Sequence, residues 1–186
     1  MVVVKYDSHT PHTSNAMKRL LPLLFLLLLM SLAACGSFGT PLPALDGTDP
    51  VPNISLPTPD GDKLSLSGYP GQVVFVNFWG TYCPPCVAEL PELQEVYDEL
   101  HDQGLVIIGL NVEEKPEKVK AFVQENHITF PIIISDDATV NAIFGLKHMP
   151  TTWIIDQNGI MRGKVVGQMD KATARKIAHK LLNETK

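Results

Sequence analysis

The feature that most constrains this chain is a pair of cysteines at the junction of a strand-like and a helix-like segment. Cys83 and Cys86 enclose two prolines in the run FVNFWGTYCPPCVAELPEL, residues 75–93. The mostly apolar residues 73–78 precede them and suit a strand in the middle of a sheet. Apolar side chains recur at helical spacing after them, at Leu90, Leu93, Tyr97 and Leu100. The fold must therefore place two thiols at the start of a helix that follows a buried strand.

The N-terminal region has the pattern of an export signal. A short cationic segment, residues 17–19, precedes an apolar and uncharged run at 20–34. At roughly 15 residues the run is short for a bilayer span, which needs about 20, and it is typical of the hydrophobic region of a secretory signal. It ends in LAAC, which resembles the lipobox of bacterial lipoproteins. We therefore expect Cys35 to be acylated and to become the new N-terminus; an ordinary signal peptide with an incidental cysteine, or an uncleaved anchor, are the alternatives.

The segments on either side of this signal are polar or rich in small residues. Residues 1–16 form a polar leader that is unusual in front of a complete signal peptide, so we expect translation to start at Met17. Residues 36–52 are rich in Gly, Pro and small polar residues, as a tether would be. The expected division is a leader and lipoprotein signal peptide at 1–34, a lipid-anchored flexible tether at 35–52 and a folded domain at 53–186. This organisation predicts an extracytoplasmic protein held to a bacterial membrane by its lipid.

The number of cysteines indicates the role of the pair. The chain has 3 cysteines, so lipidation of Cys35 leaves only Cys83 and Cys86. An exported protein meets oxidising surroundings, and a disulfide between such close residues stabilises little. The pair is therefore predicted to be a redox centre. A zinc site would need further ligands at metal spacing, and Val87 after the motif excludes a CxxCH haem attachment. We expect neither a metal nor a cofactor.

The charge of the chain limits the possible partners. Lys5, Lys18 and Arg19 against Asp7 give residues 1–34 a net charge of +2, so the rest of the chain carries −7 of the total of −5. This acidic balance argues against nucleic-acid binding or anionic-surface binding through a basic patch. The roughly 150 residues after the signal are enough for one domain.

Turn residues and apolar periodicity divide the domain into alternating strands and helices. We expect strands at 53–56, 63–66, 73–78, 105–110, 132–134, 151–155 and 160–166. We expect helices from 83 onward, at 115–126, at 139–144 with Gly145 as its C-cap, and a last one carrying Ala174, Ile177, Ala178 and Leu181. Asn158-Gly159 predicts a hairpin between the last two strands. This order predicts a mixed α/β sheet covered on both faces.

These features together resemble a known fold. The strand, then Trp79 and the CPPC motif, then Met149-Pro150-Thr151-Thr152 before a late strand, resemble a thioredoxin-like fold. More narrowly, the chain resembles the TlpA/ResA-like family of membrane-anchored thiol-disulfide oxidoreductases over about residues 51–186. The segments that carry the resemblance are FVNFWGTYCPPCVAELPEL, GLNVEEKPEKVKAFVQENHITFP and FGLKHMPTTWIIDQNG. It implies a mixed central sheet with helices on both faces, an N-terminal β-hairpin and a central helix and strand insertion. Tyr82 departs from the Trp that such proteins usually carry. Because it is still aromatic, we expect the activity to be tuned rather than lost.

The position of each cysteine suggests its role. Cys83 at the helix start faces N–H groups without helical partners and the positive end of the helix dipole, both of which favour the attacking thiolate. Cys86, one turn further, is expected to be the resolving thiol. Pro84 and Pro85 fit the first helical positions but donate no hydrogen bond to the sulfur. A reduced form that is only modestly stabilised makes a better reductant.

The resemblance also predicts where a substrate binds. It implies that the Met149-Pro150 bond is cis, with the Met149 backbone beside the sulfurs and free to pair with an extended peptide. Trp79 is expected to contribute to the same substrate site. A trans proline that merely starts an edge strand is the alternative. His148 is a further candidate to flank the site, because it is close to Pro150 in sequence.

A carboxylate in the helix is a candidate for proton transfer. Thioredoxin has a buried Asp where this chain has Asn77, and an amide cannot exchange protons. Glu89 stands three residues after Cys86, on the side of the apolar stripe, and the resemblance implies a glutamate close to the site here. A partly buried carboxylate would have a raised pKa and could exchange a proton with Cys86. The alternative is a solvated helix glutamate.

The predicted function is therefore a lipid-anchored extracytoplasmic thiol-disulfide oxidoreductase that acts as a reductant. The resemblance implies oxidised exported proteins as substrates, such as the haem-binding cysteines of apocytochrome c, and a membrane thiol reductase as electron donor. Two other functions stay open. One is a tethered metal-delivery or metal-binding module on a thioredoxin scaffold. The other is a thiol peroxidase, although peroxide reduction does not call for a resolving cysteine in CxxC.

Overall fold

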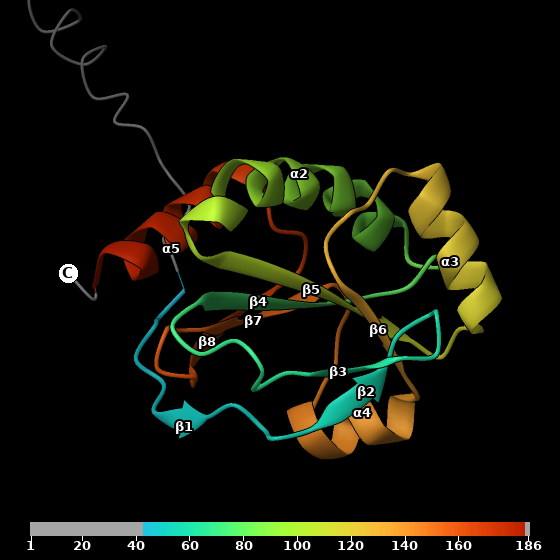
Figure 1. The fold of residues 1–186 in the computed structure, drawn as a ribbon, viewed down its shortest axis with the longest axis horizontal. Coiled ribbons are helices and arrows are strands. Elements are labelled where there is room, and N and C mark those ends of the chain that lie inside the picture. Colours follow the sequence, from blue (N-terminus) through green and yellow to red (C-terminus); the bar gives the residue numbers. More distant parts are fainter. Residues whose placement is uncertain (1–42, 185–186) are drawn as a thin grey trace, which may run out of the picture. The chain divides into compact units, whose positions relative to one another are not determined.

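A six-stranded mixed sheet forms the centre of residues 43–184, the part of the chain that this computed structural model describes (Figure 1). Its strand order is β1-β8-β7-β4-β5-β6. The strands are β1 (Asp49–Pro50), β4 (Val73–Trp79), β5 (Leu105–Val112), β6 (Ile132–Ser135), β7 (Thr151–Ile155) and β8 (Ile160–Val166), with β2 (Ser55–Pro57) and β3 (Lys63–Ser65) as a separate pair. The expected signal peptide, the Met17 start and Cys35 lie outside the described residues.

Helices cover both faces of this sheet, as expected. The helices are α2 (Pro84–Leu100), α3 (Pro116–Glu125), α4 (Asp137–Phe144) and α5 (Lys171–Glu184), with a 3-10 turn η1 (His101–Gln103) after α2. In Figure 1, α2 and α5 lie on one face and α4 lies on the other with the β2–β3 hairpin. β4, β5 and β6 are parallel. β7 pairs antiparallel with β4, and β8 pairs antiparallel with β7. The mixed α/β prediction is confirmed, including the hairpin and the central helix and strand formed by α3 and β6.

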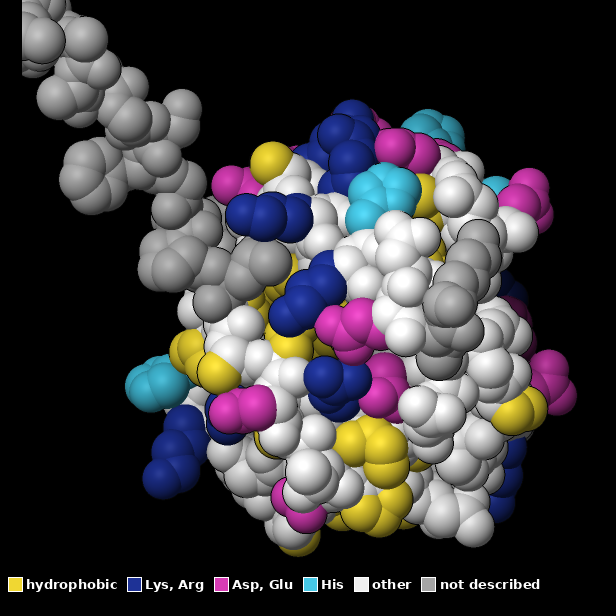
Figure 2. All heavy atoms as spheres, turned by 90° about the vertical axis from the view of Figure 1, so that its left-hand side faces the viewer, with side chains coloured by type: hydrophobic (Ala, Val, Ile, Leu, Met, Phe, Trp, Pro, Cys, Tyr) yellow, Lys and Arg dark blue, Asp and Glu magenta, His cyan; other side chains and the backbone are white. Residues whose placement is uncertain are grey.

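The surface around α5 mixes charges of both signs. Figure 2 shows basic and acidic side chains interspersed on the left-hand side of Figure 1, where α5 lies. Arg175 of α5 forms an ion pair with Glu99 of α2. An exposed pair of this kind stabilises the fold by only about 0–1 kcal/mol. None of the helices within residues 43–184 combines the length and apolar character needed to cross a bilayer.

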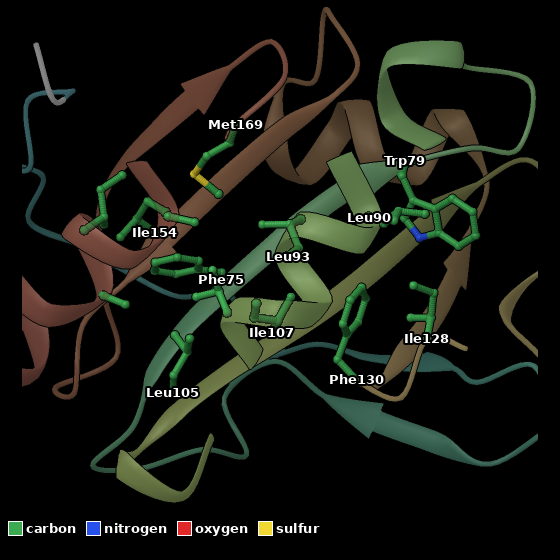
Figure 3. Packing of buried hydrophobic residues seen from close by; sticks show 14 of the residues in the cluster. Phe75, Trp79, Leu90, Leu93, Leu105, Ile107, Ile128, Phe130, Ile154 and Met169 are labelled. Carbon is green, nitrogen blue, oxygen red and sulfur yellow. The ribbon is translucent and has the colours of Figure 1, made fainter. Parts of the chain in front are cut away.

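Two apolar cores, one on each face, hold the helices to the sheet. Every residue of β4 is buried, because both of its faces are covered. Since side chains alternate along a strand, Phe75 and Trp79 face α2 while Val76 and Phe78 face α4. Figure 3 shows the α2-side core, where Leu93 of α2 lies over Ile107 of β5. The same alternation directs Asn77 of β4 toward α2, beneath the cysteines.

The segment before residue 53 differs from the expected flexible tether. Leu45 is buried, and its carbonyl oxygen accepts hydrogen bonds from the Arg162 guanidinium. The Gly47 amide donates to the Arg162 carbonyl oxygen at 2.8 Å, and β1 pairs antiparallel with β8. Residues 45–51 are therefore part of the domain. Their composition predicts a tether, but the free edge of β8 supplies the backbone partners.

Candidate active site

Cys83 and Cys86 lie just after β4, at the first turn of α2. Cys83 is the N-cap residue, and the prolines between the cysteines occupy the first helical positions, where no N–H partner is needed. The two cysteines form a disulfide, with their Cα atoms 5.3 Å apart. Cys83 is 9% exposed and Cys86 is fully buried. This difference supports Cys83 as the thiol that meets a substrate, a role that stays a prediction.

A buried polar network lies one turn further along α2. Glu89 is fully buried, so the alternative of a solvated helix glutamate is wrong. Its Oε1 accepts a hydrogen bond from Asn77 Nδ2 at 2.7 Å, and its Oε2 accepts one from the Met169 amide at 2.8 Å. Asn77 Nδ2 also donates to Thr152 Oγ1 at 2.9 Å. The network thus joins β4, α2, β7 and the loop before α5 at the cysteines' end of α2.

The surroundings of Glu89 favour its protonated form. Burial raises the pKa of Glu89 to about 7, and the charge of Glu92 adds to this effect. The hydrogen bonds from Met169 and Asn77 act in the opposite direction but do not compensate for the loss of hydration. Glu89 and Cys86 are three residues apart on α2, a spacing that brings side chains together on one helix face. A carboxyl group that titrates near neutral pH is suited to proton exchange with the Cys86 thiol.

The Met149-Pro150 peptide bond is cis, as the resemblance implied. Phe78 pairs with Thr151 in the β4–β7 register. This bond therefore lies at the end of the sheet where β4 ends and the cysteines follow. Within residues 43–184, no backbone hydrogen bond is recorded for Met149. Its amide and carbonyl groups are therefore available to an extended peptide at the edge that carries the disulfide.

Trp79, a residue expected at the substrate site, lies inside the protein rather than on its surface. The residue is fully buried and packs against Phe122 of α3, with ring centroids 5.3 Å apart. Figure 3 shows its ring between Leu90 and Ile128 in the α2-side core. Gly109 makes room for it, because a Cβ there would lie 3.0 Å from Trp79 Nε1. Trp79 instead supports the end of β4 from inside.

Glu114 is a site residue that the sequence did not reveal. Its carboxylate accepts hydrogen bonds from the Thr81 amide at 2.6 Å and from Asn111 Nδ2 at 2.8 Å. It also accepts one from the Thr81 hydroxyl and pairs with Lys118 Nζ at 2.6 Å. Burial opposes ionisation, but the bonds from Asn111, Lys118 and Thr81 outweigh it and lower the pKa of Glu114 to about 2. Glu114 therefore fixes, as a stable anion, the loop that precedes Cys83.

Tyr82 lies close enough to Glu114 for the glutamate charge to act on it. The residue is 54% exposed, and its hydroxyl donates to the Val112 carbonyl oxygen at 3.2 Å. Gly80 is needed beneath it, since a Cβ there would lie 2.6 Å from the ring. Burial raises the pKa of Tyr82, and the charges of Glu114, Glu113 and Asp137 raise it further. Tyr82 thus places a neutral aromatic surface next to Cys83.

Comparison with known proteins identifies the family of this site. Residues 48–164 match the model of the AhpC/TSA family. The chain belongs to that family. It is 36% identical over 150 residues to the thiol-disulfide oxidoreductase ResA of Geobacillus thermodenitrificans, which covers 78% of this chain and 86% of the relative. This similarity places the chain among the ResA/TlpA-like members of the thioredoxin superfamily.

Solved structures agree with this assignment. A thiol:disulfide interchange protein of the thioredoxin family from Chlorobium tepidum has a TM-score of 0.67 and 29% identity, over 73% of this chain and 97% of that one. A DsbF homologue from Corynebacterium diphtheriae has a TM-score of 0.68 and 27% identity, over 78% and 97%. The protein is a thiol-disulfide oxidoreductase with a thioredoxin-like fold. Within residues 43–184, no group of three or more His, Cys, Asp or Glu side chains is arranged to hold a metal ion.

Proposed function

We propose that the protein is a membrane-tethered, extracytoplasmic reductant of disulfides in exported proteins, acting through Cys83 and Cys86. The observation that carries the proposal is the arrangement of the pair. Cys83 at the helix start is slightly exposed, and Cys86 is fully buried three residues before Glu89, whose pKa is about 7. The export pattern at 17–35 supports the extracytoplasmic location.

The reaction begins on the reduced protein. The Cys83 thiolate attacks one sulfur of a substrate disulfide, and the substrate S–S bond breaks as the Cys83–substrate bond forms. The other substrate sulfur leaves as a thiolate and takes a proton from solvent. The product is a mixed disulfide, in which an extended substrate segment pairs with the free backbone groups of Met149.

Glu89 acts in the second half of the reaction. The Glu89 carboxylate takes the proton of the Cys86 thiol, and the Cys86 thiolate attacks the Cys83 sulfur. The bond between Cys83 and the substrate breaks, the second substrate thiolate leaves, and the protein is left in the disulfide form seen here. Two electrons have passed from the dithiol to the substrate. An external dithiol, for which a membrane thiol reductase is suited, must then reduce the protein again.

The cysteines of exported proteins are the proposed substrate class. The resemblance to the ResA-like family favours the haem-binding cysteines of apocytochrome c. A lipid on Cys35 would hold the enzyme at the membrane surface, where newly exported chains and a membrane donor are both present. Neither a metal nor a cofactor takes part in these steps.

The test is turnover combined with trapping. The reduced full chain should reduce insulin and glutathione disulfide, and Cys86→Ser should keep substrate bound to Cys83 as a mixed disulfide. Limiting iodoacetamide should label Cys83 of the reduced protein well before Cys86. Rapid consumption of peroxide, or tight metal binding without disulfide reduction, would support the other two functions. Preferential labelling of Cys86 would reverse the roles of the two sulfurs.

The location is tested separately from the chemistry. A chain that starts at Met17 should still reach the membrane fraction and carry lipid. Cys35→Ala should prevent lipidation while leaving the disulfide-reducing activity intact. Lipidation of the Cys35→Ala variant would contradict the proposed anchor.

A further inference from the structure

A pocket opens beside the cis-proline, on the α4 side of the sheet. It has a volume of about 260 Å³ and lies between the loop 145–148 and the end of β8. The side chains that matter here are Lys147, His148, Trp153, Lys164 and Val166. An aromatic ring and an aliphatic side chain thus stand beside several groups that can carry positive charge.

The pocket is positioned at the edge of the sheet that carries the disulfide. Val166 pairs with Thr151 in the β7–β8 register, and the Gly167 amide donates to the Pro150 carbonyl oxygen at 2.8 Å. The Thr151 hydroxyl donates to the His148 carbonyl oxygen, also at 2.8 Å, and so fixes the loop. A peptide that binds at Met149 therefore has this pocket beside it.

Apolar surface is also exposed at this edge. Among the described residues, Tyr82 and Val166 are the exposed large hydrophobic side chains, at 54% and 56%. Tyr82 directly precedes Cys83, whereas Val166 lies across the strand from Thr151, next to the cis-proline. Both side chains are therefore available to contact a bound peptide, Tyr82 next to Cys83 and Val166 at the pocket.

The charge of the pocket is opposite to that of the domain. Residues 35–186 carry a net charge of −7, yet Lys147 and Lys164 are both exposed and have no recorded ion pair within residues 43–184. Lys164 Nζ lies 5.0 Å from the centroid of the Trp153 ring, which places its positive charge over the pocket. Unpaired cations in an acidic domain attract an anionic group at this point.

We propose that this pocket binds an acidic side chain of the substrate polypeptide, a few residues from the disulfide that Cys83 attacks. The inference rests on the proposed reduction of protein disulfides and assigns a sequence preference to it. The carboxylate pairs with Lys147 and Lys164, and its methylene groups contact Trp153 and Val166. The volume suits one side chain of a peptide held at Met149. The preferred substrates therefore carry Asp or Glu near the target cysteine.

Binding can be measured without any redox step. The probes are two peptides in which serine replaces the target cysteine, identical except for Glu or Lys at the flanking positions. Titrated into the oxidised full chain, the Glu peptide should bind about two- to fivefold more tightly than the Lys peptide, the range of a partly exposed ion pair, and the difference should shrink at high salt. Lys164→Glu should remove or reverse the preference. The matched control is Lys176→Glu on α5, which makes the same charge change at an exposed lysine.

Turnover separates this inference from the proposed function. With cysteine-containing disulfide versions of the same peptides, Lys164→Glu should slow reduction of the Glu peptide severalfold. Reduction of the small neutral hydroxyethyl disulfide should be unchanged. If no disulfide is reduced, the proposed function fails. Binding of the serine peptides still shows whether the pocket prefers an acidic side chain. Equal binding of both serine peptides, or a preference that Lys176→Glu changes as much as Lys164→Glu does, would overturn the inference.

Discussion

Two glutamates near the disulfide, the fully buried Glu89 and the partly buried Glu114, behave in opposite ways. Glu89 has its pKa raised to about 7, whereas Glu114 has its pKa lowered to about 2. Burial opposes the charged form of both. The difference lies in burial and in partners together. Glu89 is the more deeply buried and receives hydrogen bonds only from the Asn77 amide and the Met169 backbone, while Glu114 has several donors and the cation of Lys118.

The comparison shows how one residue type serves two purposes in one site. Neutral donors in a dry environment leave Glu89 able to take up and release a proton near pH 7. The Lys118 cation and three donated hydrogen bonds, two from Thr81 and one from Asn111, hold Glu114 ionised, and this fixes the position of Thr81. Depth of burial and the number and charge of the partners therefore determine which carboxyl group titrates near neutral pH and which stays ionised.

The largest expected effect is on the rate at which the mixed disulfide is resolved. Glu89→Gln keeps the shape of the side chain but cannot accept the Cys86 proton. Resolution should slow by about 100-fold at pH 6–7, and less at higher pH where the thiol ionises without help. Stopped-flow measurement of substrate release gives the profile, with Glu99→Gln, at an exposed position of the same helix, as the control. Superimposable pH profiles of Glu89→Gln and wild type would remove Glu89 from the chemistry.

The second effect is the pH dependence of stability. Between about pH 4.5 and 7 the native state keeps Glu89 protonated while the unfolded chain has released this proton. The stabilisation is therefore complete below about pH 4.5 and is lost as the pH rises through 7, a change of about 3 kcal/mol. Urea unfolding of the oxidised wild type and Glu89→Gln should show this change in the difference between their free energies of unfolding. A difference that does not vary with pH contradicts the raised pKa.

Glu114 should show the opposite sign. Its contribution is present above about pH 4.5 and is lost as the pH falls toward 2, because only the native state holds the carboxylate ionised there. Glu114→Gln should therefore destabilise the protein by about 1–2 kcal/mol at pH 7, with the difference fading in acid. The same unfolding series provides the measurement. A loss that persists unchanged at pH 2–3 would assign the effect to packing rather than to charge.

The smallest effect is expected from the cation alone. Lys118 is 60% exposed at its side chain, so its pair with Glu114 is screened by solvent. Lys118→Met should cost no more than about 0.5 kcal/mol at neutral pH, and 1 M salt should abolish the difference. A loss as large as that of Glu114→Gln would show that the cation, rather than Thr81 and Asn111, dominates the clamp.

Local patterns in the sequence predict most of the fold and part of the site. The order of strands and helices follows from periodicity and turn residues, and the resemblance supplies the cis-proline and the glutamate on α2. Trp79 is expected to contribute to the substrate site, whereas the alternation along the apolar strand β4 directs it into the α2-side core. Glu114 is not predictable in this way, because its contact with Thr81 joins residues 33 positions apart.

Local sequence patterns also do not predict the contacts of the loop between β8 and α5. The Gly167 amide donates to the Pro150 carbonyl oxygen, next to Met149, where substrate is expected to pair. Two residues later the Met169 amide donates to Glu89. Two amides of one short segment thus hydrogen-bond to the cis-proline and to Glu89. Because the hydrogen bond from the Met169 amide lowers the pKa of Glu89, the position of this loop helps to set the acidity of the carboxyl group.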